Sequence, residues 1–196
     1  MTKAKKICLA SGIIGALIVF SIGVLLMVQA NKVPEMKYNF SYLNIYDSFD
    51  EVYQAADNVL VGKPVSMYSY KLHDVVFTDV HVQVAENVKG DTTDSYIDIT
   101  YTGGLFEGVN YVAEEIVIPP VNGDTYLFLT TGVDEHTGKR YALNSFQGTY
   151  KLNYNANTTT FAQSNAQILR FNPQNKIENE LLQSNSSIVN IVESLQ

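Results

Sequence analysis

The hydrophobic pattern of the chain begins with a long apolar segment. Residues 7–28 contain no ionisable side chain except the thiol of Cys8, and an apolar run of about 20 residues is long enough to cross a bilayer as a helix. Three lysines precede the segment within the first six residues, and positive charge before a span favours a cytoplasmic N-terminus. Residues 1–30 are therefore predicted to form a cytoplasmic tip and a transmembrane helix. The remainder of this single-pass protein of the cell membrane is then extracellular.

A cleaved signal peptide is the alternative interpretation of the same segment. Val28, Gln29 and Ala30 provide the residue types that a signal peptidase accepts, and cleavage after Ala30 would give a secreted domain. The apolar region of a signal peptide is typically about 7–15 residues long, and residues 7–28 exceed that length. The sequence therefore favours a retained signal anchor, and both interpretations export the rest of the chain.

A polar stretch and a short helix follow the apolar segment. Residues 31–47 are rich in Tyr and Asn and contain Pro34, so they are expected to form a stalk. Ser48 and Glu51 then have the spacing of a capping box, in which their side chains accept the free backbone N–H groups at a helix start. The box predicts a helix over residues 49–56 whose apolar face consists of Phe49, Val52, Tyr53 and Ala56.

From residue 58 the pattern changes from helical spacing to alternation. The clearest strand has Val76, Thr78, Val80, Val82 and Val84 on one face and Phe77, Asp79, His81 and Gln83 on the other. Further strands are predicted over residues 58–65, 96–102, 115–118, 125–130, 140–146 and 149–154. Gly148, between the last two, is expected to supply a positive φ at a chain reversal. Many short strands with regular turn signals predict a mainly β domain over residues 48–172, an antiparallel sandwich or barrel.

The C-terminal segment, residues 173–196, returns to helical spacing. It is rich in Asn, Gln and Ser, yet apolar residues recur on one face at Ile177, Leu181, Ile188, Val189, Val192 and Leu195. Residues 184–187 interrupt this face. One or two amphipathic helices are expected here, docked on the β domain.

Charge and cysteine content narrow the classes of partner. All 20 acidic residues lie after residue 30, with 10 of the 13 basic ones, so the exported part has a formal charge of −10. Such a surface repels phosphate backbones and anionic headgroups, so nucleic acid is not an expected partner, and the expected contact with the membrane is through residues 7–28. The exported part also lacks cysteine, which suits a Gram-positive surface better than a disulfide-stabilised secreted domain.

No catalytic, cofactor or metal site is predicted. The spacings typical of zinc proteases, serine hydrolases and EF-hands do not occur in the sequence. Three histidines, His73, His81 and His136, fall in separate predicted elements, so they do not indicate a shared zinc site. Calcium binding stays open as an alternative, because acidic residues follow two turns at Asp91, Asp94, Asp98, Glu107, Glu114 and Glu115.

Tyrosines and acidic loop residues are the candidates for partner binding. Tyr carries an apolar ring with a polar tip, which suits contact surfaces and stacking on sugars, although it also favours strands. Tyr68 and Tyr70 alternate near a strand end, and Glu107, Glu114 and Glu115 lie in the loop over residues 103–120. These five residues form the predicted partner-binding set.

The order of the motifs resembles an uncharacterised membrane-anchored extracytoplasmic domain of Gram-positive bacteria. That domain is similar to the netrin-like module of tissue inhibitors of metalloproteinases, and the resemblance implies an OB-type barrel with flanking short helices. It rests on residues 56–63, 80–90, 103–104, 123–129 and 146–150. Those inhibitors use a free N-terminal cysteine to chelate the protease metal. This chain has no exported cysteine, so the resemblance does not carry the inhibitory mechanism.

Three functions are compatible with these observations. The favoured one is a membrane-anchored, non-enzymatic binding domain that contacts a protein or envelope partner through loops such as residues 103–120. The first alternative is an envelope hydrolase whose acid and base come from Asp98, Glu107, Glu114 and Glu115, which would require two carboxylates with separated pKa values in one cleft. The second alternative is the sensor or scaffold part of a membrane complex.

Overall fold

The computed structural model describes residues 33–38, 45–113, 116–154, 160–164, 166–184 and 187–195. The predicted membrane segment, residues 7–28, and the alternative cleavage site at Ala30 lie outside these ranges, as do residues 31–32 and 39–44 of the predicted stalk. Within the stalk, residues Glu35–Tyr38 form a strand. Within the described ranges, no helix has the length and hydropathy needed to cross a membrane. Residues from Glu35 onward form one compact unit.

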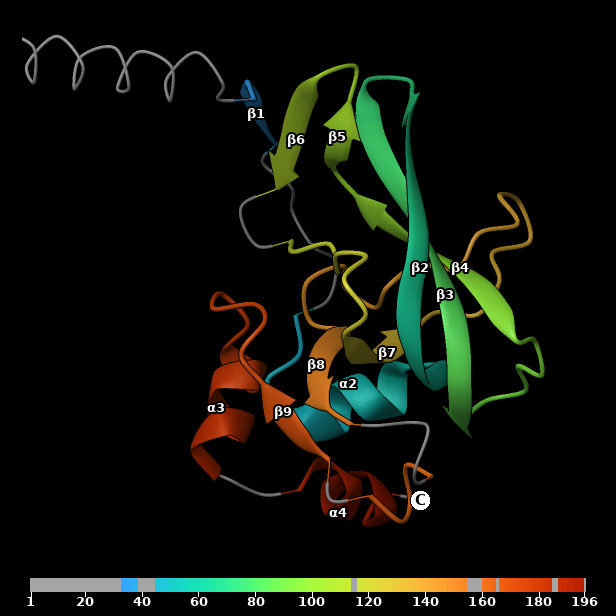
Figure 1. Ribbon diagram of the computed structural model, residues 1–196, viewed down its shortest axis with the longest axis vertical. Coiled ribbons are helices and arrows are strands. Elements are labelled where there is room, and N and C mark those ends of the chain that lie inside the picture. The colour runs from blue at the N-terminus through green and yellow to red at the C-terminus, as the bar shows by residue number, and fades with distance from the viewer. Residues whose placement is uncertain are drawn as a thin grey trace, which may run out of the picture. The chain divides into compact units, whose positions relative to one another are not determined.

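This unit is mainly β and contains two sheets and three short helices among its described residues (Figure 1). The larger sheet is antiparallel, with strand order β4-β3-β2-β7-β8-β9, and the smaller has the order β1-β6-β5, with β1 parallel to β6. The strands are β1 (Glu35–Tyr38), β2 (Asn58–Leu72), β3 (Val75–Lys89), β4 (Tyr96–Thr102), β5 (Gly104–Phe106), β6 (Val109–Ala113), β7 (Thr125–Thr130), β8 (Thr149–Asn153) and β9 (Gln167–Leu169). The helices are α2 (Phe49–Ala55), α3 (Lys176–Ser184) and α4 (Ile188–Glu193). In the described part of the chain β4 and β9 are the outermost strands of this order, and β4 has only an isolated bridge from Thr100 to Tyr141 on its other side, so no closed barrel is seen there.

The capping box and the helix that it predicts are confirmed at α2. The Ser48 hydroxyl accepts the backbone N–H of Glu51 at 3.3 Å. The Glu51 carboxylate accepts the backbone N–H of Asp47 at 2.9 Å, one residue earlier than an ideal box requires. The predicted apolar face is buried, with exposed fractions of 4% or less at Phe49, Val52, Tyr53 and Ala56.

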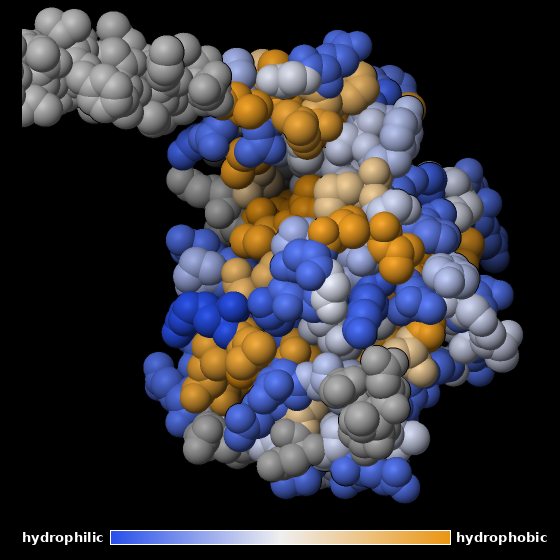
Figure 2. Space-filling view, viewed as in Figure 1, coloured by the Kyte–Doolittle hydropathy of each residue, from blue (hydrophilic) through white to orange (hydrophobic). Residues whose placement is uncertain are grey.

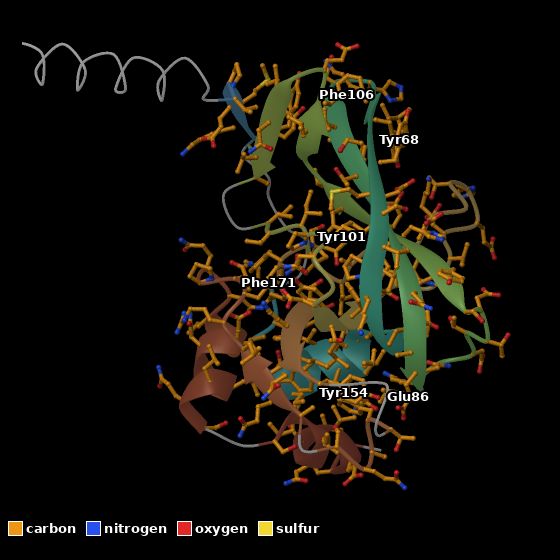
Figure 3. The ribbon with its side chains drawn as sticks, viewed as in Figure 1. Tyr68, Glu86, Tyr101, Phe106, Tyr154 and Phe171 are labelled. Atoms are coloured by element: carbon orange, nitrogen blue, oxygen red, sulfur yellow. The ribbon has the colours of Figure 1, made fainter. Side chains whose placement is uncertain are left out.

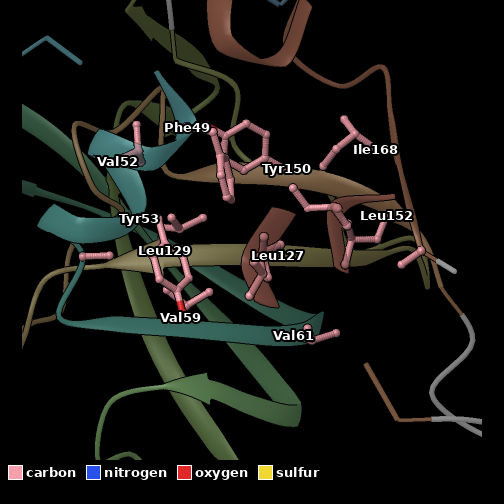
Figure 4. Close-up of a cluster of buried hydrophobic side chains, with 14 of the residues drawn as sticks. Phe49, Val52, Tyr53, Val59, Val61, Leu127, Leu129, Tyr150, Leu152 and Ile168 are labelled. Carbon is pink, nitrogen blue, oxygen red and sulfur yellow. The ribbon is translucent and has the colours of Figure 1, made fainter. Parts of the chain in front are cut away.

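The alternation of β3 is also confirmed. Val76, Thr78, Val80 and Val82 are buried, whereas the residues between them are only partly covered. The buried hydrophobic side chains of the domain form two cores, and β2 and β7 contribute residues to both. The helix-side core contains buried residues of α2, β7, β8, β9, α3 and α4 (Figure 4). The opposite core, called the hairpin-side core, consists of Leu60, Val80, Val82, Ile97, Ile99, Tyr101, Tyr126, Phe128 and Ala142.

Both predicted C-terminal helices form, and their apolar residues join the helix-side core. A buried carboxylate fixes the chain just before α3. Glu178 is fully buried and accepts the backbone N–H groups of Phe171 and Asn172 at 3.0–3.1 Å. Burial raises the pKa of Glu178, against the opposing effect of these donors. The docking of residues 173–195 thus depends on polar contacts as well as on the apolar spacing.

Two strand predictions are wrong and one is too short. Residues 140–146 contribute only isolated pairings at Tyr141 and Ala142, after which Asn144 and Ser145 take positive φ values of 48° and 47°. Residues 116–118 form no strand. The strand predicted to end at residue 65 continues to Leu72, because a register shift next to Pro64 absorbs the missing backbone donor.

Candidate functional site

A groove of about 680 Å³ lies beside the β2–β3 hairpin. We call it the apolar groove. It is lined by Met67, Tyr68, Ser69, Thr78, Thr102, Gly104, Leu105, Asn110, Tyr111, Val112, Ala113, Ile116, Val117, Ile118 and Pro120. Figure 2 shows hydrophobic residues gathered in a hollow on this side of the domain. None of the described residues that line the groove is charged, so this part of its surface is suited to an apolar occupant.

Two glycines direct the chain from the larger sheet into the wall of this groove. Gly103 and Gly104 follow β4 with φ values of 97° and 123°, which side chains rarely adopt. Thr78 on β3 donates its hydroxyl hydrogen to the Gly103 carbonyl at 2.6 Å. A Cβ at Gly104 would overlap the Thr78 hydroxyl, so only glycine allows β5 to approach the hairpin this closely.

A tight hairpin and an irregular segment complete the wall. The turn between β5 and β6 contains Glu107 and Gly108, with φ values of 48° and 77°. Beyond β6, the Ile116 N–H donates to the Ala113 carbonyl at 3.1 Å. Ile116 and Ile118 then pack against the hairpin-side core. The wall of the groove is therefore held in place by packing against the hairpin-side core and does not consist of loops alone.

The rim of the groove exposes large apolar side chains. Met67 is 44% exposed and Leu105 is 58% exposed. Contiguous exposed apolar surface is rare on soluble domains except at interaction or ligand sites. We therefore take the groove and its rim as the candidate binding surface.

An aromatic row lies on the hairpin next to the groove. Tyr68 and Tyr70 have ring centroids 6.1 Å apart and planes within 16°, and Tyr70 and Phe77 follow at 6.0 Å and 27°. Tyr68 is 69% exposed, and Figure 3 shows it beside the hairpin, away from the buried Tyr101. Tyr68 and Tyr70 therefore lie side by side on one face of β2.

A charged pair holds the aromatic row in place. The Asp79 carboxylate forms an ion pair with Lys139 and accepts hydrogen bonds from the hydroxyls of Thr100 at 2.7 Å and Tyr70 at 3.3 Å. The Lys139 ammonium lies 5.1 Å from the centre of the Tyr70 ring. Burial, followed by the nearby Asp79 charge, raises the pKa of Tyr70. The Tyr70 ring is therefore fixed, neutral and partly exposed.

The acidic candidates that the structure describes do not gather in the groove. Glu107 lies at the exposed tip of the β5–β6 turn, and Glu114 and Glu115 lie outside the described residues. Asp98 is on β4, where it contacts His81 at 2.7 Å. Neither Asp98 nor Glu107 lines the apolar groove.

The metal candidates also lie apart from one another. His73 lies in the β2–β3 turn, His81 on β3 and His136 in the turn after β7. Among the residues that the structure describes, no group of three or more His, Cys, Asp or Glu side chains is arranged to hold a metal ion.

Sequence reasoning missed several residues of these surfaces. Met67 and Leu105 have no distinctive local pattern, and only the fold brings them to one groove. Lys139 is distant from Asp79 and Tyr70 in sequence. The sequence signal that could have indicated this surface was the polar face of the alternating strand over residues 76–84, which contains Asp79.

Comparison with models of known protein families finds no match to this chain, and no curated protein sequence matches it significantly.

Proposed function

We propose that this chain is a membrane-anchored extracytoplasmic binding domain whose apolar groove receives an apolar segment of a protein or envelope partner. The observation that carries the proposal is an accessible groove of about 680 Å³ whose described lining residues carry no charge. Its volume lies within the roughly 300–1,000 Å³ of pockets that take drug-sized ligands. The loop over residues 103–120, predicted to contact the partner, supplies most of its wall.

The groove also has the few polar groups that a specific binding site needs. Asn110 provides an amide at the lining, and the hydroxyls of Ser69 and Thr78 lie 2.8 Å apart within it. Amides and hydroxyls both donate and accept hydrogen bonds. An extended apolar peptide, or a similar chain with occasional polar atoms, matches this arrangement.

Site-specific photo-crosslinking in native cells tests this function. A benzophenone amino acid is placed at Leu105 on the groove rim in the full-length protein. The matched control position is Val133, which is 56% exposed against 58% for Leu105 but does not line the groove. A discrete adduct is expected from position 105 and not from 133. Val112→Asp, which places a charge in the groove, should remove it.

Equal crosslinking at both positions, or an adduct that persists in Val112→Asp, would contradict the proposal. The thermal midpoint of Val112→Asp is measured in parallel, so that loss of the adduct can be separated from loss of folding. Val112 is only partly buried, so the variant is expected to fold.

For the fold, we propose that the larger sheet is a variant of the OB-type barrel of the netrin-like module. The support is the order of motifs along residues 56–150 together with the short helices that flank the sheet. The inhibitory chemistry of that module is not part of the proposal.

For the location, we propose that residues 7–28 anchor the protein and that the domain is extracellular. The uninterrupted apolar run and the lysines before it support this orientation. Protease added to intact protoplasts is expected to digest the domain and spare a tag fused to the N-terminus. A surviving domain with a cleaved tag would show the opposite orientation, and release of an intact domain starting at Asn31 would show cleavage after Ala30.

A further inference from the structure

We propose that the outer face of strands β2, β3 and β4 binds a neutral glycan chain through its aromatic row and an adjoining small pocket. This site goes beyond the proposed function, because only Tyr68 belongs to both the aromatic row and the apolar groove. Its occupant also differs in chemistry, being a hydroxylated ring polymer rather than an apolar segment.

Strand pairing places the rings of this face together. Tyr70 is paired with Phe77 across β2 and β3, and Tyr68 is paired with Asp79. Directly paired residues of neighbouring strands project to the same face of a sheet. Alternation along β3 then brings His81 to this face as well.

A second ring pair extends the face toward β4. His81 and Tyr96 have centroids 5.3 Å apart and planes within 3°, and Tyr96 is 50% exposed. Tyr96 is paired with Gln83, six residues beyond Phe77. At about 3.3 Å per residue, the rings therefore span about 20 Å along β3. An elongated polymer can contact several of them at once.

The adjoining pocket limits the size of each bound unit. It has a volume of about 210 Å³ and is lined by Tyr70, Leu72, Phe77, Thr137, Lys139 and Tyr141. This volume is below the roughly 300–1,000 Å³ typical of pockets for drug-sized ligands. The pocket therefore admits one small ring at a time, as expected for one unit of a longer chain.

The lining of this pocket matches the two faces of a sugar ring. Tyr70 and Phe77 offer apolar rings for the C–H face of a pyranose. Lys139 offers N–H donors, and the hydroxyls of Thr137 and Tyr141, 3.3 Å apart, can donate to or accept from sugar hydroxyls. A proline-rich peptide also docks in aromatic grooves, but its rings have no hydroxyl groups to use these partners.

The pocket is ordered before any ligand binds. Asp79 forms an ion pair with Lys139 and accepts a hydrogen bond from the Tyr70 hydroxyl. Asp79 is itself held by a hydrogen bond from the Thr100 hydroxyl. Preorganised side chains lose little conformational entropy on binding. The charge of Lys139 is balanced by Asp79, so the site favours a neutral glycan over an anionic one.

The test uses the absence of tryptophan from the chain. Tyr68→Trp introduces a single fluorescent reporter into the full-length protein, held in phosphatidylcholine nanodiscs to avoid sugar-based detergents. The probes are hexamers of β-1,4-linked glucose, β-1,4-linked N-acetylglucosamine and α-1,4-linked glucose. We expect a saturable change in emission with at least one hexamer. Adding Phe77→Ala should weaken its binding about tenfold, equivalent to about 1.4 kcal/mol.

A further variant serves as the control. Leu169→Ala removes an exposed side chain on β9 and should leave glycan binding unchanged. Failure of all three hexamers, or equal affinity with and without Phe77, would overturn the proposal. Saturable binding of decaproline instead of the sugars would also overturn it and assign the face to proline-rich peptides. Val112→Asp should not affect glycan binding, so the two proposed sites can fail independently.

Discussion

Replacement of Val82 by aspartate is expected to abolish folding of the domain. Val82 is fully buried in the hairpin-side core. A Cβ added to Gly62 would lie only 2.6 Å from Val82 Cγ1, so Val82 is tightly packed. An unpaired buried carboxylate costs several kcal/mol after relaxation. This is comparable to the whole stability of a typical domain, about 5–15 kcal/mol.

His81→Ala is the matched control, one residue away on the opposite face of β3. His81 stacks on Tyr96 and contacts Asp98, but its side chain is 41% exposed. Exposed pairs of this kind contribute about 0–1 kcal/mol. The thermal midpoint should therefore fall by no more than about 4 °C.

Circular dichroism of the full-length protein in lipid nanodiscs, followed during heating, distinguishes the two variants. Val82→Asp should lack a cooperative transition, and His81→Ala should retain one near that of the parent. Similar melting of both variants would show that the buried face of β3 has been misassigned.

The sequence predicted those elements whose pattern is local. The alternation along β3 reflects the two-residue period of a strand, and the spacing of Ser48 and Glu51 reflects a helix cap, so each can be recognised within a few residues of sequence. The run over β7 (Thr125–Thr130) was recognised because a strand buried on both faces has few polar residues. In the structure, Leu127 and Leu129 enter the helix-side core, and Tyr126 and Phe128 the hairpin-side core.

Elements that depend on distant contacts were not predictable in the same way. The β2–β3 hairpin continues past Pro64 to Leu72 and β5 contacts it, an arrangement that no local pattern encodes. Residues 140–146 alternate enough to suggest a strand, yet Asn144 and Ser145 turn the chain. The structure therefore replaces an expected strand by a tight connection packed against β7.

The residues of the candidate site also differ in whether a local sequence pattern predicts their arrangement. Tyr68 and Tyr70 could be paired from the period of a strand alone. The Asp79–Lys139 pair and the apolar groove could not, because their parts come from segments that only the tertiary fold brings together. Local sequence thus identified neighbouring aromatic side chains but not the surfaces to which they belong.

Gly148→Ala is expected to destabilise the domain by about 3 kcal/mol or more, for a reason that differs from the predicted one. The expectation of a positive φ at Gly148 is wrong, since its φ lies outside that region. The requirement comes instead from close backbone packing. A Cβ there would lie 2.5 Å from the Leu129 carbonyl oxygen and 2.6 and 2.7 Å from the backbone nitrogen and oxygen of Leu143.

These neighbours cannot move away cheaply. The Leu129 N–H donates to the Gly148 carbonyl at 2.8 Å, and the Leu143 N–H donates to the Leu129 carbonyl at 2.8 Å. Relief of the overlap would therefore break hydrogen bonds that join β7 to both flanking segments. It would also displace Tyr150, which is fully buried with its ring centroid 5.4 Å from that of Phe49.

Gly132→Ala provides the control for the same chemical change. A Cβ at Gly132 would meet only the Asp57 side chain, at 3.4 Å or more, and its φ is not positive. This variant should melt close to the parent or slightly above it, because alanine reduces the conformational entropy of the unfolded chain. Denaturant unfolding of both variants measures the difference. If Gly148→Ala were as stable as Gly132→Ala, the close approach of residues 129, 143 and 148 would be incorrect. The path of the chain between β7 and β8 would then be incorrect as well.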